Sequence, residues 1–109
     1  MTQYAIVLVT APSQTEAEAI ASSLITECLA ACVSITPIHS FYRWQGQVHS
    51  DQEWQLVIKT TLDLFPSISE KIIELHSYEV PEIIAIPIVQ GSSAYLNWIA
   101  SNTNTIINP

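Results

Sequence analysis

Apolar residues recur along this chain with two different periods, and the changes of period predict its helices and strands. Continuous or alternating apolar runs, which are typical of strands, occupy residues 4–9, 32–44, 47–59 and 83–89. Apolar residues spaced three and four apart, which form one face of a helix, occupy residues 17–29, 66–75 and 95–99. The predicted order is therefore strand, helix, strand, strand, helix, strand and a short final helix.

Turn and capping residues support these boundaries. Ser13 and Glu16 have the spacing of a capping box at the start of the first helix. Residues 45–46, Gln-Gly, supply a turn between the second and third strands. Pro66 suits the first turn of the second helix, where its missing N–H costs little. Pro81 fixes its own φ and pushes the preceding residue into an extended conformation, so the second helix must end before it.

This order of elements is that of the α+β, ferredoxin-like split β-α-β-β-α-β sandwich. With right-handed crossovers, a mostly antiparallel sheet lies under helices on one face, and its other face needs a separate cover. A chain of 109 residues is enough for a single domain, 1–109, with one core. The C-terminal helix is an addition to this plan, and the polar tail from Ser101 is expected to be loose.

The predicted hairpin around Gly46 is longer than a domain of this size can shelter. Two strands of about thirteen residues extend roughly 40 Å each, whereas such a domain has a radius of gyration near ~13 Å. The hairpin would therefore overhang, and it carries the aromatic residues Phe41, Tyr42, Trp44 and Trp54. Because a bare aromatic edge aggregates, we predict that it packs against neighbouring copies in a closed cyclic oligomer.

Charge narrows the classes of partner. Charged residues make up 12% of the chain, with Arg43, Lys59 and Lys71 as its three cations, and the formal net charge is −7. This charge argues against nucleic acid, whose phosphates demand a basic face, and it is compatible with cations. No segment is long enough to span a bilayer, and the first residues lack the features of a signal peptide. The expectation is a cytoplasmic protein without a membrane partner.

The common signatures of enzymes are missing from the sequence. With two glycines in the chain, neither G-x-G-x-x-G nor a Walker motif can form, and no G-x-S-x-G element occurs. Acid–base catalysis by His76 and Glu82 is chemically conceivable, but nothing identifies a substrate. We therefore predict a protein that is not an enzyme.

Cys28 and Cys32 lie four residues apart, on one predicted helix face near its end. A disulfide between them is disfavoured in a reducing compartment. Two readings stay open: two buried, small apolar side chains, or a C-x-x-x-C half-site for a metal.

Residues 76–83, His-Ser-Tyr-Glu-Val-Pro-Glu-Ile, gather a histidine, a tyrosine and two carboxylates at a rigid helix-to-strand junction. Neutral imidazole ligates copper, zinc or nickel, so His76 is the first candidate metal ligand. The alternative is a histidine that hydrogen-bonds a carbonyl in the last helical turn. One histidine cannot hold a metal tightly, so Glu82, Glu79 or a residue of another chain would have to assist. If Glu82 is buried, it can instead form an ion pair with Lys59.

Tyr42, Trp44 and Tyr78 are candidates for the wall of a ligand pocket between subunits, although the same aromatics could serve only as interface and core. In such a cleft Lys59 could hold an anionic ligand while Glu82 and His76 face a cation.

Four sequence blocks closely resemble the CutA family, the divalent-cation tolerance proteins. The blocks are VLVTAP (7–12), LAACVSI (29–35), SFYRWQG (40–46) with Glu53 and IKTT (58–61), and HSYEVPEI (76–83) followed by YLNW (95–98). The resemblance runs from Tyr4 to about Ile99. It implies a ferredoxin-like homotrimer, similar in architecture to the PII signalling proteins, and a link to copper and other divalent metals.

The chain departs from the family pattern at proposed copper ligands. Some members carry a cysteine near the end of the first strand and a second histidine before the final block, where this chain has Val9 and Leu75. Ser77 also replaces the usual proline of that block. Of that ligand set His76 remains, so the resemblance implies weak metal binding.

Three hypotheses of function follow. The first is a trimeric CutA-like protein that binds copper or zinc weakly at His76 and Glu82 and acts in metal tolerance. The second is a PII-like small-molecule or anion sensor that binds its ligand in the inter-subunit cleft, near Lys59. The third is a scaffold trimer without a ligand.

Overall fold

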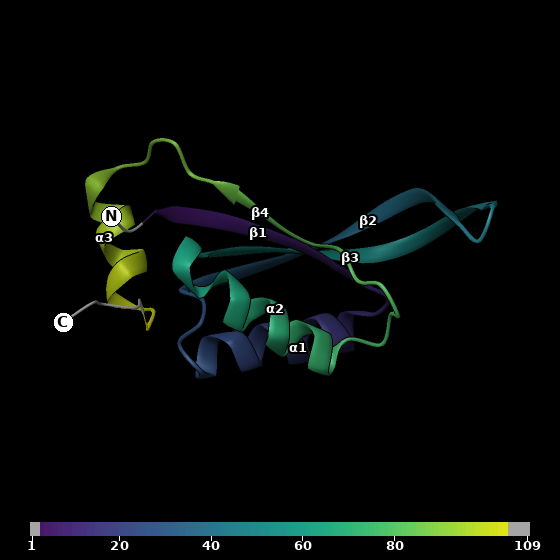
Figure 1. Cartoon of the computed structure of the whole chain (residues 1–109), viewed down its shortest axis with the longest axis horizontal. Coiled ribbons are helices and arrows are strands. Elements are labelled where there is room, and N and C mark those ends of the chain that lie inside the picture. Colours follow the sequence, from purple (N-terminus) through teal and green to yellow (C-terminus); the bar gives the residue numbers. More distant parts are fainter. Residues whose placement is uncertain (1–2, 105–109) are drawn as a thin grey trace.

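The computed structural model describes residues 3–104. Its elements are β1 (Tyr4–Ala11), α1 (Gln14–Thr26), β2 (Cys32–Trp44), β3 (Gln47–Thr61), a short 3₁₀ turn (Leu62–Leu64), α2 (Phe65–Leu75), β4 (Ile83–Pro87) and α3 (Ser93–Ser101). The four strands form one antiparallel sheet in the order β2-β3-β1-β4, and α1 and α2 lie side by side against one of its faces (Figure 1). The predicted ferredoxin-like α+β fold, with a C-terminal helix added, is confirmed.

Side-chain caps set the starts of two helices. Ser13 precedes α1 in an extended conformation, and its Oγ accepts a hydrogen bond from the Glu16 N–H at 3.1 Å. Ser92 does the same for α3, accepting from the Tyr95 N–H at 3.3 Å. Each cap satisfies a backbone donor that the first helical turn leaves without a partner. The predicted loose tail begins as ordered chain, since Ser101 ends α3, and its last residues, 105–109, lie outside the described part.

The first helix is shorter at its C-terminal end than the periodicity predicts. It ends at Thr26, and Cys28 takes the left-handed conformation, with φ of 57°, that often terminates helices. Cys28 is exposed, whereas Cys32 is half-buried and opens β2. The expectation of two cysteines on one helix face was therefore wrong, because the chain reverses between them.

The core lies between the sheet and the two long helices. Its fully buried members come from β1 and β3 on one side and from α1 and α2 on the other: Val7, Val9, Leu56, Ile58, Ile20, Leu24, Ile68 and Ile72. The apolar spacing of the second helix runs to Leu75, but this last residue of α2 is exposed and lies outside the core. From Tyr4 to Val9 the buried positions of β1 alternate with half-buried ones, so this part of the strand is fully buried on one face only.

The second sheet face, here called the open face, points away from α1 and α2 (Figure 1). The register places Ile6 beside Ile86 and Leu8 beside Ile84 on this face. Ile84 and Ile86 remain 48% and 46% exposed. The apolar side chains of β1 and β4 on the open face are thus only partly covered in a single chain. β4 itself ends at Pro87, before the predicted Val89.

The β2–β3 hairpin overhangs the helical layer, as predicted. The two strands pair continuously from Cys32 opposite Lys59 to Trp44 opposite Gln47, and the molecule measures 48 × 26 × 22 Å along its principal axes. Gln45 and Gly46 both have positive φ, 51° and 77°, the pattern of a tight two-residue hairpin turn. In Figure 1 the hairpin extends well past α1 and α2.

No helix within residues 3–104 has the length and apolar character needed to cross a lipid bilayer.

Ile72 and Ile73 test the core directly, because they are neighbours on α2 with opposite environments. Ile72 is fully buried and Ile73 is 61% exposed. We expect Ile72→Ala to lower the free energy of unfolding by about 2–5 kcal/mol, through lost burial and the cavity left behind. Ile73→Ala should change it by less than about 1 kcal/mol. Chemical denaturation of both variants measures this, and equal losses would contradict the assignment of the inner face.

Candidate functional site

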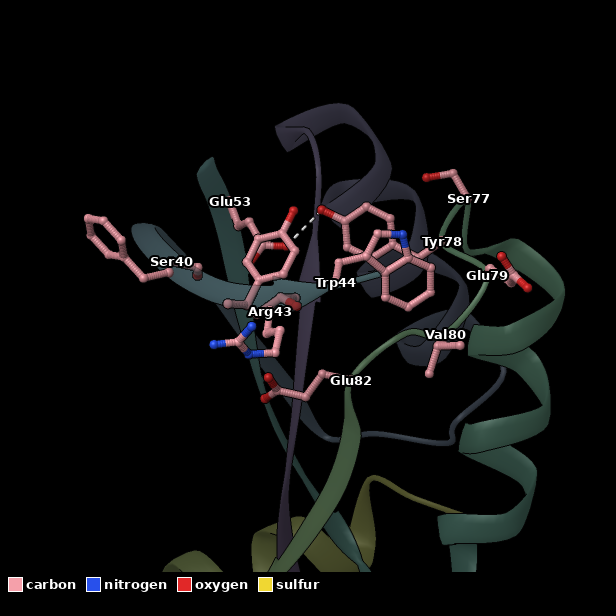
Figure 2. Close-up of a pocket in the computed structure, with 12 residues that line it drawn as sticks. Ser40, Arg43, Trp44, Glu53, Ser77, Tyr78, Glu79, Val80 and Glu82 are labelled. Atoms are coloured by element: carbon pink, nitrogen blue, oxygen red, sulfur yellow. Dashed lines mark hydrogen bonds between the residues drawn. The ribbon is translucent and has the colours of Figure 1, made fainter. Parts of the chain in front are cut away.

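A cavity of about 650 Å³ lies between the overhanging part of the β2–β3 hairpin and the loop at residues 77–82, here called the 77–82 loop (Figure 2). Its wall is formed by Ser40–Trp44 of β2, Glu53 of β3 and Thr10 of β1, together with Ser77–Val80 and Glu82 of the loop. The cavity combines aromatic faces with carboxylates, and most of the site residues predicted from the sequence line it or adjoin it.

His76 fixes the start of this loop. It follows α2 in an extended conformation, with φ of −84° and ψ of 141°, and its side chain is 0% exposed. Its Nδ1 lies 2.9 Å from the backbone N of Tyr78, and its Nε2 lies 2.6 Å from the carbonyl oxygen of Thr10. The Tyr78 N–H can only donate, so Nδ1 accepts, and Nε2 carries the proton that it donates to the carbonyl. The ring therefore joins the loop to the end of β1.

Glu16 reinforces the same anchor from α1. Its Oε2 accepts hydrogen bonds from the backbone N and the Oγ of Ser77, at 3.2 and 3.1 Å, and lies 3.4 Å from His76 Nδ1. Both ring nitrogens of His76 are thus committed within the chain. The expectation that His76 presents a free nitrogen to a metal is corrected: the ring is a buried structural link, close to the hydrogen-bonding alternative considered from the sequence.

Tyr78 turns from the loop towards the hairpin and donates a hydrogen bond from its hydroxyl to Glu53 Oε2 at 2.7 Å (Figure 2). Glu53 is only 6% exposed. Burial, followed by the hydrogen bond to the Glu53 carboxylate, raises the pKa of Tyr78 well above its usual value. The phenol therefore stays protonated and keeps donating throughout the physiological pH range.

Tyr42 and Trp44 form the hairpin side of the cavity. The Tyr42 hydroxyl donates to Asp51 Oδ2 at 2.5 Å, and its ring stacks on His49 at a centroid distance of 5.4 Å. That hydrogen bond to Asp51 is the main reason why the pKa of Tyr42 is raised. Tyr42 and Trp44 remain 39% and 38% exposed. The structure thus brings Tyr42, Trp44 and Tyr78 together in the lining of one cavity within a single chain, while the predicted ligand pocket between subunits stays a prediction.

Glu82 and Lys59 are not brought together. Glu82 is exposed, lines the cavity and points toward the hairpin, while Glu79 points away (Figure 2). Lys59 lies beside Ile6 in the sheet, away from the cavity, and donates to Ser34 Oγ at 3.4 Å. The ion pair between the two, expected for a buried Glu82, is not formed. An anion in this cavity would meet carboxylates without Lys59 to offset them.

The sequence analysis predicted no functional role for Glu53, yet in the structure it is the most buried carboxylate of the site. A signal was available, because Glu53 directly precedes Trp54 and the apolar residues of β3, where a charged side chain needs a partner. Among residues 3–104, no three histidine, cysteine or acidic side chains are grouped closely enough to hold a metal ion. The described residues of one chain therefore do not form a complete metal centre on their own.

Comparison with known proteins places this geometry in a family. Residues 5–102 match the model of the family described as CutA1 divalent ion tolerance protein. The "Divalent-cation tolerance protein CutA" of Thermus thermophilus is 50% identical over 90% of this chain and 96% of its own length. The chloroplastic "Protein CutA" of Arabidopsis thaliana is 44% identical over 90% of this chain but 54% of its own length. Among solved structures, the periplasmic divalent cation tolerance protein CutA of Archaeoglobus fulgidus superimposes with a TM-score of 0.89, at 39% identity, over 91% of this chain and 97% of its own.

These names correct the expectation of a cytoplasmic protein. The Archaeoglobus structure is described as periplasmic and the Arabidopsis relative as chloroplastic. Proteins with this fold work in several compartments, so the absence of signal-peptide features in the first residues was not a sound basis for a cytoplasmic assignment. Fold, sequence blocks and overall similarity agree on one point: the chain belongs to the CutA1 family of divalent ion tolerance proteins.

Proposed function

We propose that this protein acts in tolerance of divalent cations and binds such an ion, copper or zinc, weakly at the rim of the cavity. The observation that carries the proposal is the charge of the cavity lining, which includes three carboxylates, Glu53, Glu79 and Glu82, and one cation, Arg43. Glu82 is the candidate ligand, since it is exposed and has no hydrogen bond or ion pair among residues 3–104.

Weak binding is consistent with the ligands that one chain offers. A carboxylate oxygen is a general ligand for divalent cations, but tight sites for copper or zinc use several nitrogen or sulfur ligands. His76 is committed to Thr10 and Tyr78, so it supplies none. Any higher affinity requires donors from neighbouring copies of the chain. The relatives are named for tolerance and not for a reaction, so the proposal is for a binding protein and not for an enzyme.

A homotrimer is the assembly that we propose for this site. The hairpin overhangs the helical layer, Phe41 on it is 73% exposed, and the open face keeps Ile84 and Ile86 half-exposed. Apolar surface of this extent favours self-association, and closed cyclic symmetry covers it on every copy. The PII-like alternative, an anion sensor near Lys59, has less support because Lys59 lies outside the cavity and the cavity is acidic.

The assembly can be checked by sedimentation. We expect a species of three times 12.1 kDa at micromolar protein, because the exposed hairpin and open face are then covered. Replacing Phe41 and Ile86 together by Ser should shift the distribution toward smaller species. A wild-type chain that sediments as a stable monomer would remove the trimer from the proposal.

Calorimetric titration with Cu²⁺ and with Zn²⁺ tests the proposed ligand. Glu82→Gln keeps the shape of the side chain and removes its charge, so we expect at least about tenfold weaker binding, the lower end of the loss seen when even outer-shell partners are removed. Glu70→Gln is the matched control, because Glu70 is also exposed but lies on α2, away from the cavity. Equal affinity of wild type and Glu82→Gln would exclude Glu82.

Substitution of His76 should change the stability of the protein but not its affinity for metal. His76→Gln loses the pair of hydrogen bonds that joins Thr10 and Tyr78, and we expect it to lower the free energy of unfolding by about 1–3 kcal/mol. Its affinity for Cu²⁺, measured under conditions where the variant is fully folded, should stay within about twofold of wild type. Unchanged stability with lost copper binding would restore His76 as a ligand.

A further inference from the structure

Glu53 is a buried carboxylate that forms no ion pair within the described part of the chain. It is 6% exposed, and its carboxylate accepts a hydrogen bond from the neutral hydroxyl of Tyr78. Of the three cations of the chain, Lys71 lies 2.9 Å from Glu27 and Lys59 lies far along the sheet. Arg43 lines the same cavity, but within residues 3–104 it forms no ion pair with Glu53 and donates instead to the Gly46 carbonyl oxygen at 3.5 Å.

A buried negative charge of this kind is costly unless another group compensates it. A carboxylate has about four lone-pair positions, and Tyr78 uses one of them. Because Glu53 lines the cavity and its side chain is turned into it (Figure 2), the unused positions face space that a ligand can enter. The missing partner of Glu53 is therefore expected inside the cavity.

The residues around Glu53 favour a ligand that carries a positive charge on an apolar or aromatic group. The rings of Tyr42, Trp44 and Tyr78 line the cavity, and aromatic faces attract cations as well as apolar groups. Tyr42 already donates its hydroxyl to Asp51, as Tyr78 does to Glu53, so neither phenol is left to serve an anion.

Four classes of occupant can be compared on these grounds. An anion would meet a lining with three carboxylates and one cation, Arg43. A bare metal ion needs several ligands around it, which the described residues do not group together, and it leaves most of a cavity of about 650 Å³ unused. A quaternary ammonium ion suits the rings but has no N–H for Glu53. A protonated amine on an apolar or aromatic body satisfies both the carboxylate and the rings, and the cavity has the size of a small-molecule site.

We propose that this cavity binds a protonated organic amine, with the ammonium N–H groups on the Glu53 carboxylate and the apolar body against Tyr42, Trp44 and Tyr78. This site lies deeper than the Glu82 rim and needs no divalent cation. It therefore stands independently of the proposed role in metal tolerance.

The test uses the full chain, freed of metal with a chelator and in its native assembly, with 2-phenylethylamine as the probe. Binding is followed by calorimetry and by tryptophan fluorescence, to which Trp44 in the wall contributes. We expect saturable binding of the amine, at least about tenfold weaker binding of its N,N,N-trimethyl analogue, and none of 2-phenylethanol or phenylacetate at the same concentrations. Equal binding of amine and alcohol, or no binding of the amine, would overturn the proposal.

Glu53→Gln is the decisive variant. Its amide oxygen can still accept from Tyr78, so the fold is kept while the charge is removed. We expect at least about tenfold weaker amine binding, an unchanged or higher melting temperature without amine, and loss of the amine-dependent rise in melting temperature. Glu70→Gln on α2 should bind the amine as wild type does, and Glu82→Gln should keep amine binding even if it loses the metal.

Two further outcomes would refute the amine site. If Zn²⁺ raises the melting temperature of the wild type while the amine does not, and if Zn²⁺ has no such effect on Glu53→Gln, the cavity is a metal site. If the amine fails and Arg43→Gln mimics Glu53→Gln in the sedimentation of the assembly, the partner of Glu53 is an arginine of a neighbouring copy.

Discussion

The pairing of β3 with two neighbours is the constraint on which the structure depends. Along its inner half, from Thr61 to Trp54, β3 is hydrogen-bonded to β1, and from Lys59 to Gln47 it is also bonded to β2. Residues 54–61 of β3 therefore lie in the sheet beside β1, whereas residues 47–53 lie in a two-stranded ribbon with β2 alone. The pairing of β1 with β3 ends at Trp54. Glu53, the next residue of β3 towards the hairpin turn, is therefore the first one in the two-stranded ribbon. The cavity forms at this step because one strand stops while two continue.

The loop after α2 closes the space that this step creates. His76 bonds to the carbonyl of Thr10, near the end of β1, and to the backbone of Tyr78. The ring thereby ties the loop to the same place where the sheet narrows, and Tyr78 reaches Glu53 from there. A histidine and a tyrosine from one short segment thus contact two different strands. The geometry of the site follows from backbone hydrogen bonding as much as from side-chain chemistry.

Much of the fold was readable from the sequence, because periodicity and caps are local. The capping serine at position 13, the turn at Gly46 and the length of the hairpin were all predicted from neighbouring residues and were confirmed. The boundary of α1 was not, since apolar spacing continues past Thr26 while Cys28 adopts a left-handed conformation. Apolar spacing alone cannot detect where a chain reverses.

The site was predicted less completely, and the reason is the distance along the chain between its parts. Tyr42, Trp44 and Tyr78 were named as candidates for the wall of a pocket between subunits, and within one chain they line one cavity. The roles of His76 and Glu53 depend on partners 66 and 25 residues away. Residue type tells what an imidazole can bind, whereas only the tertiary structure tells that both of its nitrogens are already used. The same holds for Lys59, whose strand register separates it from Glu82.

The central position of β1 also bears on how the chain assembles during synthesis. β1 is made first, yet its two partners, β3 and β4, are made later: Val7 pairs with Ile58 and with Ala85. The β2–β3 ribbon joins residues that are close in sequence and closes a short loop, so it forms at lower entropic cost. Although β1 is synthesised before the other three strands of this sheet, it is therefore among the last of them to find its place, and its apolar side chains must stay unpaired until β3 and β4 have been translated.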